Sequence, residues 1–213
     1  MTTTLYSPLE ELMHALSHGL GALLSIVALV LMVLLSVQSG DNWHLFSSIV
    51  YGSSLILLYS SSTLYHAIHH IDIKRRLRQL DHAAIFILIA GTYTPFTLIN
   101  LRDNWGLPLF GLIWLVAAIG VTIELATGLR YKKLSLSLYL GMGWLVIVAI
   151  QPMLRHVATE GLLLLLAGGL SYSLGVLFYI WKRLFMHHAI WHLFVLAGSV
   201  LHFLAVYYYA LPV

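Results

Sequence analysis

The sequence contains no cysteine, and only 9% of its 213 residues are Asp, Glu, Lys or Arg. The absence of cysteine excludes disulfide partners, thiolate metal sites and thiol catalysis. Soluble domains have about 25% charged residues, so a water-soluble protein of this length would lack the polar side chains to cover its surface. Hydrophobic residues make up 60%, which excludes intrinsic disorder. The net charge of +3 is small and dispersed, so we expect no nucleic-acid partner.

Long apolar stretches occur along the whole chain. A helix needs about 20 mostly apolar residues to cross a bilayer core of ~30 Å, and seven stretches meet this requirement. The sequence therefore predicts an all-α membrane protein of the cell (inner or plasma) membrane, in which residues 19–213 form a seven-transmembrane helix bundle. The predicted spans are 19–38, 45–66, 80–100, 107–127, 134–154, 161–181 and 188–209.

Lysine and arginine residues predict the direction of this bundle. Nine of the eleven lie in the second, fourth and sixth loops. The positive-inside rule therefore places these loops and the N-terminus in the cytoplasm and the C-terminus outside. Residues 1–18 are predicted to form a short cytoplasmic amphipathic segment, with Ser7 as the N-cap of a helix and Pro8 as its first residue. The nine are Lys74, Arg75, Arg76, Arg78, Arg130, Lys132, Lys133, Lys182 and Arg183.

Histidine is abundant, with twelve residues in a chain that has little charge. Imidazole is the commonest metal ligand and titrates near neutral pH, and ionisable groups inside spans are costly and usually functional. Clustered histidines therefore indicate a metal site or a proton-handling site. Nine of them lie at or near the predicted cytoplasmic ends of spans, namely His14, His18, His66, His69, His70, His82, His187, His188 and His192.

Three of the spans carry polar residues at the same depth. His188 and His192 begin the last span with i, i+4 spacing, which puts both imidazoles on one helix face. His66 ends the second span, and Asp81 begins the third. Each has a simpler explanation by itself: the histidines can pack at the membrane interface, and an acid is favourable at a helix N-terminus. Together they predict three imidazoles around one ion with a carboxylate beside them.

Three imidazoles and a water are the composition of an open, catalytic type of zinc site. Zinc is the expected ion, and manganese, iron and cobalt stay open as alternatives. Ser62, one turn deeper than His66, either faces this site or packs as a small residue at a helix contact.

Five further residues have less decided roles. His14 and His18 form another i, i+4 pair. For these two residues, contact with the metal ligands from behind or simple packing is favoured over direct metal ligation. His82 projects about 100° away from Asp81 on a helix and is left outside the ligand set. Glu124 either pairs with basic residues of the fourth loop or faces the site. Pro95 is predicted to loosen the third span one turn earlier, near Gly91.

The sequence resembles the bacterial haemolysin III family, a branch of the progestin and adipoQ receptor proteins within the superfamily that includes alkaline ceramidases. In the receptors that it resembles, the matching positions imply zinc binding by His66, His188 and His192, with Asp81 contacting the zinc-bound water. Ser62 matches the serine of the superfamily's second span. The resemblance rests on Glu10–Glu11, Ser17–Gly19, Ser62–His66, Asp81–His82, Gly91–Phe96 and His188–His192.

Two functions fit this predicted site. The first is a zinc-dependent hydrolase of a lipid amide or ester, in which Asp81 moves the proton of the attacking water and Ser62 assists as a hydrogen-bonding group. The second is a non-catalytic, zinc-stabilised membrane sensor resembling a receptor. Both take a membrane lipid as substrate or ligand. An oligomeric pore is the least favoured alternative, because no span has a polar face suited to lining a channel.

Overall fold

The computed structural model describes residues 6–102 and 105–212. Residues 1–5 of the predicted N-terminal segment and Val213 of the predicted bundle lie outside these ranges. Every regular element within them is helical. The elements are α1 (Pro8–Ser39), α2 (Asn42–Ala67), α3 (Ile71–Pro95), η1 (Phe96–Asn100), α4 (Gly106–Thr127), α5 (Lys132–Gly143), η2 (Leu145–Ala149), α6 (Ile150–His156), α7 (Thr159–Ile180) and α8 (His187–Tyr209).

Seven helical segments are long and apolar enough to cross a membrane, and they follow the seven predicted spans in order. The third span combines α3 with η1, and the fifth combines α5, η2 and α6. Large apolar side chains such as Leu23, Leu34 and Leu163 are exposed on the outside of the bundle. An apolar outer surface of this kind is suited to contact with the hydrocarbon core of a lipid bilayer. The chain is therefore a multi-pass membrane protein with an all-helical, seven-helix fold.

The first helix is longer than its predicted span, because α1 begins at Pro8 and continues to Ser39 without a break. Ser7 is its N-cap, and the Ser7 hydroxyl accepts a hydrogen bond from the Glu10 backbone N–H at 3.3 Å. The Glu10 carboxylate in turn accepts from the Ser7 backbone N–H at 2.8 Å. This reciprocal capping box fixes the start of α1 and confirms the predicted cap.

The irregular part of the third span follows Pro95 and does not precede it. α3 remains α-helical through Gly91 to Pro95, and the π-helical turn η1 begins at Phe96, so the predicted loosening near Gly91 is wrong. The hydroxyls of Thr94 and Thr97 donate to the carbonyls of Ala90 and Tyr93 at 2.9 and 3.0 Å. Threonine hydroxyls of this kind satisfy backbone groups around a proline in a membrane helix.

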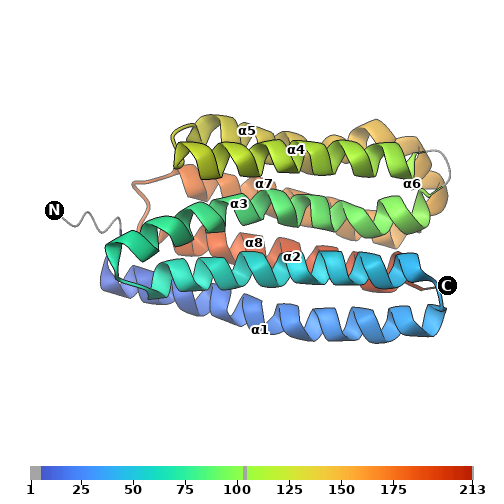
Figure 1. The fold of residues 1–213 in the computed structure, drawn as a ribbon, viewed down its shortest axis with the longest axis horizontal. Helices are drawn as coiled ribbons and strands as arrows, with labels where there is room; N and C mark the ends of the chain where they lie inside the picture. Colours follow the sequence, from blue (N-terminus) through green and yellow to red (C-terminus); the bar gives the residue numbers. More distant parts are fainter. Residues whose placement is uncertain (1–5, 103–104, 213) are drawn as a thin grey trace.

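The helices lie side by side, with the start of α1 and the end of α8 at opposite ends of the bundle (Figure 1). The connections from α2 to α3 and from α7 to α8 lie at the end where the chain begins (Figure 1). α1 packs against both α2 and α8. Gly21 of α1 lies directly against the ring of Tyr59 on α2, where a Cβ atom would clash. This close approach holds α1 tightly against α2.

Candidate metal centre

Five buried histidines from three helices converge at this end of the bundle, and we call them the histidine cluster. The i, i+4 pairs His14/His18 on α1 and His188/His192 on α8 each place two imidazoles on one helix face. His66 comes from the last turn of α2. The cluster can form because α1 packs against both α2 and α8.

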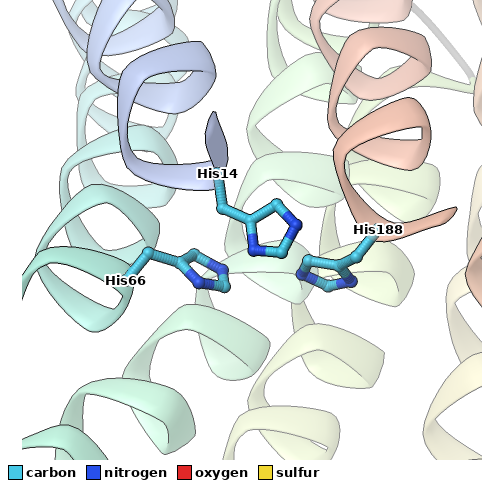
Figure 2. Close-up of side chains that lie close together, drawn as sticks. All are labelled: His14, His66 and His188. Carbon is cyan, nitrogen blue, oxygen red and sulfur yellow. The ribbon is translucent and has the colours of Figure 1, made fainter. Parts of the chain in front are cut away.

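Three members of the cluster lie at metal-binding distance. His14, His66 and His188 each offer a ring nitrogen, and these nitrogens lie within 4.8 Å of one another. Figure 2 shows the three imidazoles, one from each helix, pointing toward a common centre. We call them the three-histidine group. The sequence favoured a role outside the metal ligands for His14. Its i, i+4 pairing with His18 was the signal that could have placed it in the three-histidine group.

The chemistry of these nitrogens fits a metal ion. Both ring nitrogens of His14 and of His188, together with Nε2 of His66, are buried without a hydrogen-bond partner among the described residues. Unsatisfied buried polar atoms are rare and costly, so several in one place require an explanation. A divalent cation would accept lone pairs from all three rings. Imidazole donors without thiolates suit zinc, and also copper, nickel or iron.

His192 lies beside the three-histidine group and is held differently. Its ring centroid is 4.6 Å from that of His188 and 5.3 Å from those of His14 and His66. The Ser17 hydroxyl donates to the His14 carbonyl at 3.0 Å, so its oxygen can accept from Nδ1–H of His192 at 3.1 Å. That arrangement leaves the buried, unpartnered Nε2 of His192 with its lone pair.

Glu11 holds the ring of His66. One carboxylate oxygen lies 2.6 Å from Nδ1 of His66, and the other lies 3.1 Å from the Lys74 ammonium on α3. Lys74 also donates to the Tyr65 carbonyl at 2.8 Å. A carboxylate that accepts from Nδ1–H fixes the tautomer in which Nε2 is free to bind a metal. Sequence reasoning missed this role, because Glu11 stood out only as part of the Glu10–Glu11 motif.

The predicted Ser62 and Asp81 do not join the three-histidine group. The Ser62 hydroxyl lies 2.7 Å from Nδ1 of His18, whose ring stacks on that of His192 with centroids 3.4 Å apart. Asp81 is 5% exposed and lies 3.5 Å from Nδ1 of His82. His82 itself contacts the Arg78 carbonyl at 2.9 Å.

Tyr6 covers the histidine cluster from the N-terminal side. Its ring centroid lies 4.8 Å from that of His14 and 5.0 Å from that of His188, with the latter pair stacked. Burial raises the pKa of the Tyr6 phenol. The residue therefore contributes a neutral aromatic cover over two members of the three-histidine group.

An apolar cavity begins beside the cluster and continues along α3. His18 and Asp81 line its end nearest the cluster, and Ile85, Leu88 and Thr92 line it further along. Between Asp81 and Thr92 an α-helix rises about 16 Å, which is a large part of the thickness of a bilayer core. His18 stacks on His192. It is therefore the member of the histidine cluster that also lines the cavity.

Comparison with known proteins identifies close sequence similarity over nearly the whole chain. Residues 6–203 match the family model described as "Haemolysin-III related". The chain is 46% identical to hemolysin-3 of Bacillus cereus, over 95% of this chain and 93% of that protein. It is 44% identical to a hemolysin-3 homolog of Bacillus subtilis (strain 168), over 96% of both chains. It is also 32% identical to the human monocyte to macrophage differentiation factor, over 92% of this chain and 84% of that protein. The range matched by the family model, residues 6–203, spans the whole histidine cluster.

Proposed function

This chain belongs to the haemolysin-III related family, and we propose that it is a metal-dependent hydrolase of a membrane lipid amide or ester. The observation that carries the proposal is the combination of three elements in one region. These are a group of unpartnered buried imidazoles, a buried carboxylate at Asp81 and an apolar cavity that reaches His18 and Asp81. Metal ligands, a proton acceptor and a space for a hydrocarbon tail are the parts that such a reaction requires.

The proposed ligands come from the histidine cluster. His66, His188 and His192 are the set that the sequence predicts, and the distances add His14. We propose zinc as the ion because the donors are imidazole nitrogens, which are common zinc ligands. A bound zinc ion lowers the pKa of water to about 7, so that hydroxide exists at neutral pH.

Asp81 is the proposed proton carrier. Its carboxylate lines the cavity, so a linkage positioned at this end of the cavity would lie within its reach. In the proposed reaction the water oxygen bonds to the carbonyl carbon and Asp81 accepts the water proton. The C–N or C–O bond then breaks, and Asp81 returns the proton to the departing nitrogen or oxygen. Atoms and charge balance without a further reactant.

Ser62 is proposed to act at the same end of the cavity. Its hydroxyl lies 2.7 Å from Nδ1 of His18, which is the residue that contacts both cluster and cavity. Ser62 therefore fixes the His18 ring at the boundary between metal ligands and substrate. The proposed substrate lies with its acyl chain along α3 and its polar linkage beside His18 and Asp81.

We also propose that this site lies at the cytoplasmic side of the membrane. The start of α3, which carries Lys74, Arg75 and Arg76, and the α7–α8 connection, which carries Lys182 and Arg183, lie at the same end of the bundle as the start of α1 (Figure 1). The positive-inside rule assigns such an end to the cytoplasm. The C-terminal end would then face outward.

A non-catalytic role has one specific observation in its favour. The unpartnered Nε2 of His192 lies beside the three-histidine group, so four imidazoles are available to one ion. A zinc ion with four protein ligands is a structural, closed site. In that case the metal ties α1, α2 and α8 together, and the protein is a zinc-stabilised sensor of a lipid.

One experiment separates the two roles. Purified full-length protein with a measured zinc content is incubated with a long-chain fatty amide and with a lipid ester, and free fatty acid is quantified. We expect zinc-dependent release, and we expect Asp81→Asn to retain zinc while losing at least 100-fold of the rate. Zinc-loaded protein that releases no fatty acid from either compound would refute the hydrolase and favour the sensor.

A further inference from the structure

Three positively charged residues from different elements lie at one end of the bundle, and we call them the basic cluster. Arg78 lies on α3, Lys132 begins α5, and Lys182 lies in the connection between α7 and α8. The α4–α5 and α7–α8 connections lie at the same end of the bundle as the start of α3 (Figure 1). Residues far apart in the sequence therefore bring three positive charges to one region.

The members of the basic cluster are close enough to act on one another. Burial lowers the pKa of the Lys182 ammonium, and the positive charges of Lys132 and Arg78 lower it further. Water and salt screen exposed charges that are more than about 8 Å apart, so this effect indicates short separations. Lys182 also lies over the ring of Tyr179, 4.4 Å from its centroid, and Lys132 and Tyr179 line the same cavity.

The basic cluster takes part in no ion pair with a carboxylate in the described part of the chain. The pairs that lysine and arginine form there are Lys74–Glu11, Arg75–Asp72 and Arg102–Asp41. Like charges held close together without an acid between them repel one another. Such an arrangement is stabilised when an anion binds between the charges.

Arg78 is the member whose surroundings favour an anion most. Its side chain is half-buried, and the side-chain hydrogen bond that involves Arg78 uses its backbone carbonyl, with His82 as the partner. A guanidinium has five N–H donors in a planar fork. A cation partly withdrawn from water needs a compensating partner. Because no described residue provides one, an anion from outside the chain would satisfy it.

The neighbours of the cluster indicate where that anion comes from. Tyr131 precedes Lys132, Trp181 precedes Lys182, and Phe185 follows in the same connection. These aromatic side chains are 49%, 55% and 72% exposed. In membrane proteins, aromatic side chains gather at the level of the lipid headgroups. The basic cluster therefore lies at the depth where phospholipid phosphates are available.

We propose that the basic cluster binds the phosphate group of an anionic glycerophospholipid, with Arg78 as its bidentate partner and Lys132 and Lys182 as point charges beside it. The planar fork of arginine matches the geometry of phosphate oxygens, and lysine binds phosphate through its charge. A zwitterionic headgroup would bring its own cation close to three positive charges. The lipid is a bound partner here, and its binding depends on neither a metal nor turnover.

Native mass spectrometry of the purified full chain in detergent provides the test, because it counts bound lipids directly. The protein is titrated with phosphatidylglycerol and, separately, with phosphatidylcholine that has the same acyl chains. Each Lys or Arg near an anionic lipid contributes about a fivefold gain in affinity. We therefore expect the first phosphatidylglycerol to bind at least tenfold more tightly than the first phosphatidylcholine, and raised salt should reduce the difference.

Variants locate the binding. Arg78→Gln should weaken phosphatidylglycerol binding at least tenfold and leave phosphatidylcholine binding unchanged. Arg76→Gln is the matched control, because it removes the same charge from an exposed position on the same helix, about 200° around the helix axis from Arg78. Lys182→Gln, which alters a connection and no helix, should weaken phosphatidylglycerol binding at least threefold.

Equal affinities for phosphatidylglycerol and phosphatidylcholine in the unaltered protein would overturn the inference, and this comparison needs no variant to fold. Equal effects of Arg78→Gln and Arg76→Gln would overturn it as well. Inorganic phosphate is added in a third series to separate a lipid site from a site for the free anion. Displacement of phosphatidylglycerol by an equal concentration of inorganic phosphate would contradict the lipid assignment.

Discussion

The carboxylate of Glu11 lies 2.6 Å from Nδ1 of His66, across the contact between α1 and α2. The same carboxylate binds Lys74 at 3.1 Å, so one side chain joins α1, α2 and α3 at the candidate metal centre. Its position makes Glu11 a positioning residue for His66. The neighbouring Glu10 points to the N-cap instead, which gives a natural pair for comparison.

Glu11→Gln should lower zinc affinity about 10- to 100-fold, as loss of a carboxylate behind a histidine ligand does. Glu10→Gln is the control, because glutamine can still accept from the Ser7 backbone N–H in a capping box. A competitive titration of purified protein against a zinc chelator gives both affinities. Equal affinities for the two variants would show that Glu11 does not orient His66.

His14→Gln should weaken zinc binding at least tenfold, since its nitrogens belong to the three-histidine group and have no hydrogen-bond partner among the described residues. The control is His69→Gln, which alters an exposed histidine between α2 and α3. The same chelator competition measures both. Unchanged affinity in His14→Gln would return this residue to the packing role that the sequence favoured.

Zinc should stabilise the folded bundle, because a ligand that binds only the native state adds about 2.7 kcal/mol at 100 times its dissociation constant. Chelation should therefore lower the thermal unfolding midpoint, and added zinc should restore it. His66→Ala should unfold at a midpoint that zinc does not change. A zinc response of the same size in His66→Ala and in the unaltered protein would place the ion elsewhere.

Gly120→Ala should destabilise the bundle by about 1–3 kcal/mol, the usual cost of overpacking. A Cβ atom at this position of α4 would clash with the ring of Phe86 on α3. Gly111→Ala is the control on the same helix, where a Cβ atom meets no atom within 4 Å. Thermal unfolding in one detergent compares them. A lower midpoint for Gly111→Ala than for Gly120→Ala would contradict this packing.

The sequence by itself determined the class of the protein and the order of its spans. Hydrophobic length is a local property of each segment, so the stretch predicted at 107–127 reappears as α4 (Gly106–Thr127). The cap at Ser7 was also readable, because capping involves residues three apart. The position of the irregular turn near Pro95 was not, because α3 continues to Pro95 and the π-helical turn begins only at Phe96.

Only the tertiary structure decided which imidazoles meet. The i, i+4 spacing shows that His14 and His18 share a face of α1, but not that this face turns toward α2 and α8. The partners of Glu11 and Glu124 likewise lie on other helices. Such contacts depend on how each helix is rotated about its axis and how closely its neighbours approach. Packing between segments distant in sequence sets the rotation of each helix and the distance to its neighbours. Neither can be predicted from the periodicity of a single segment.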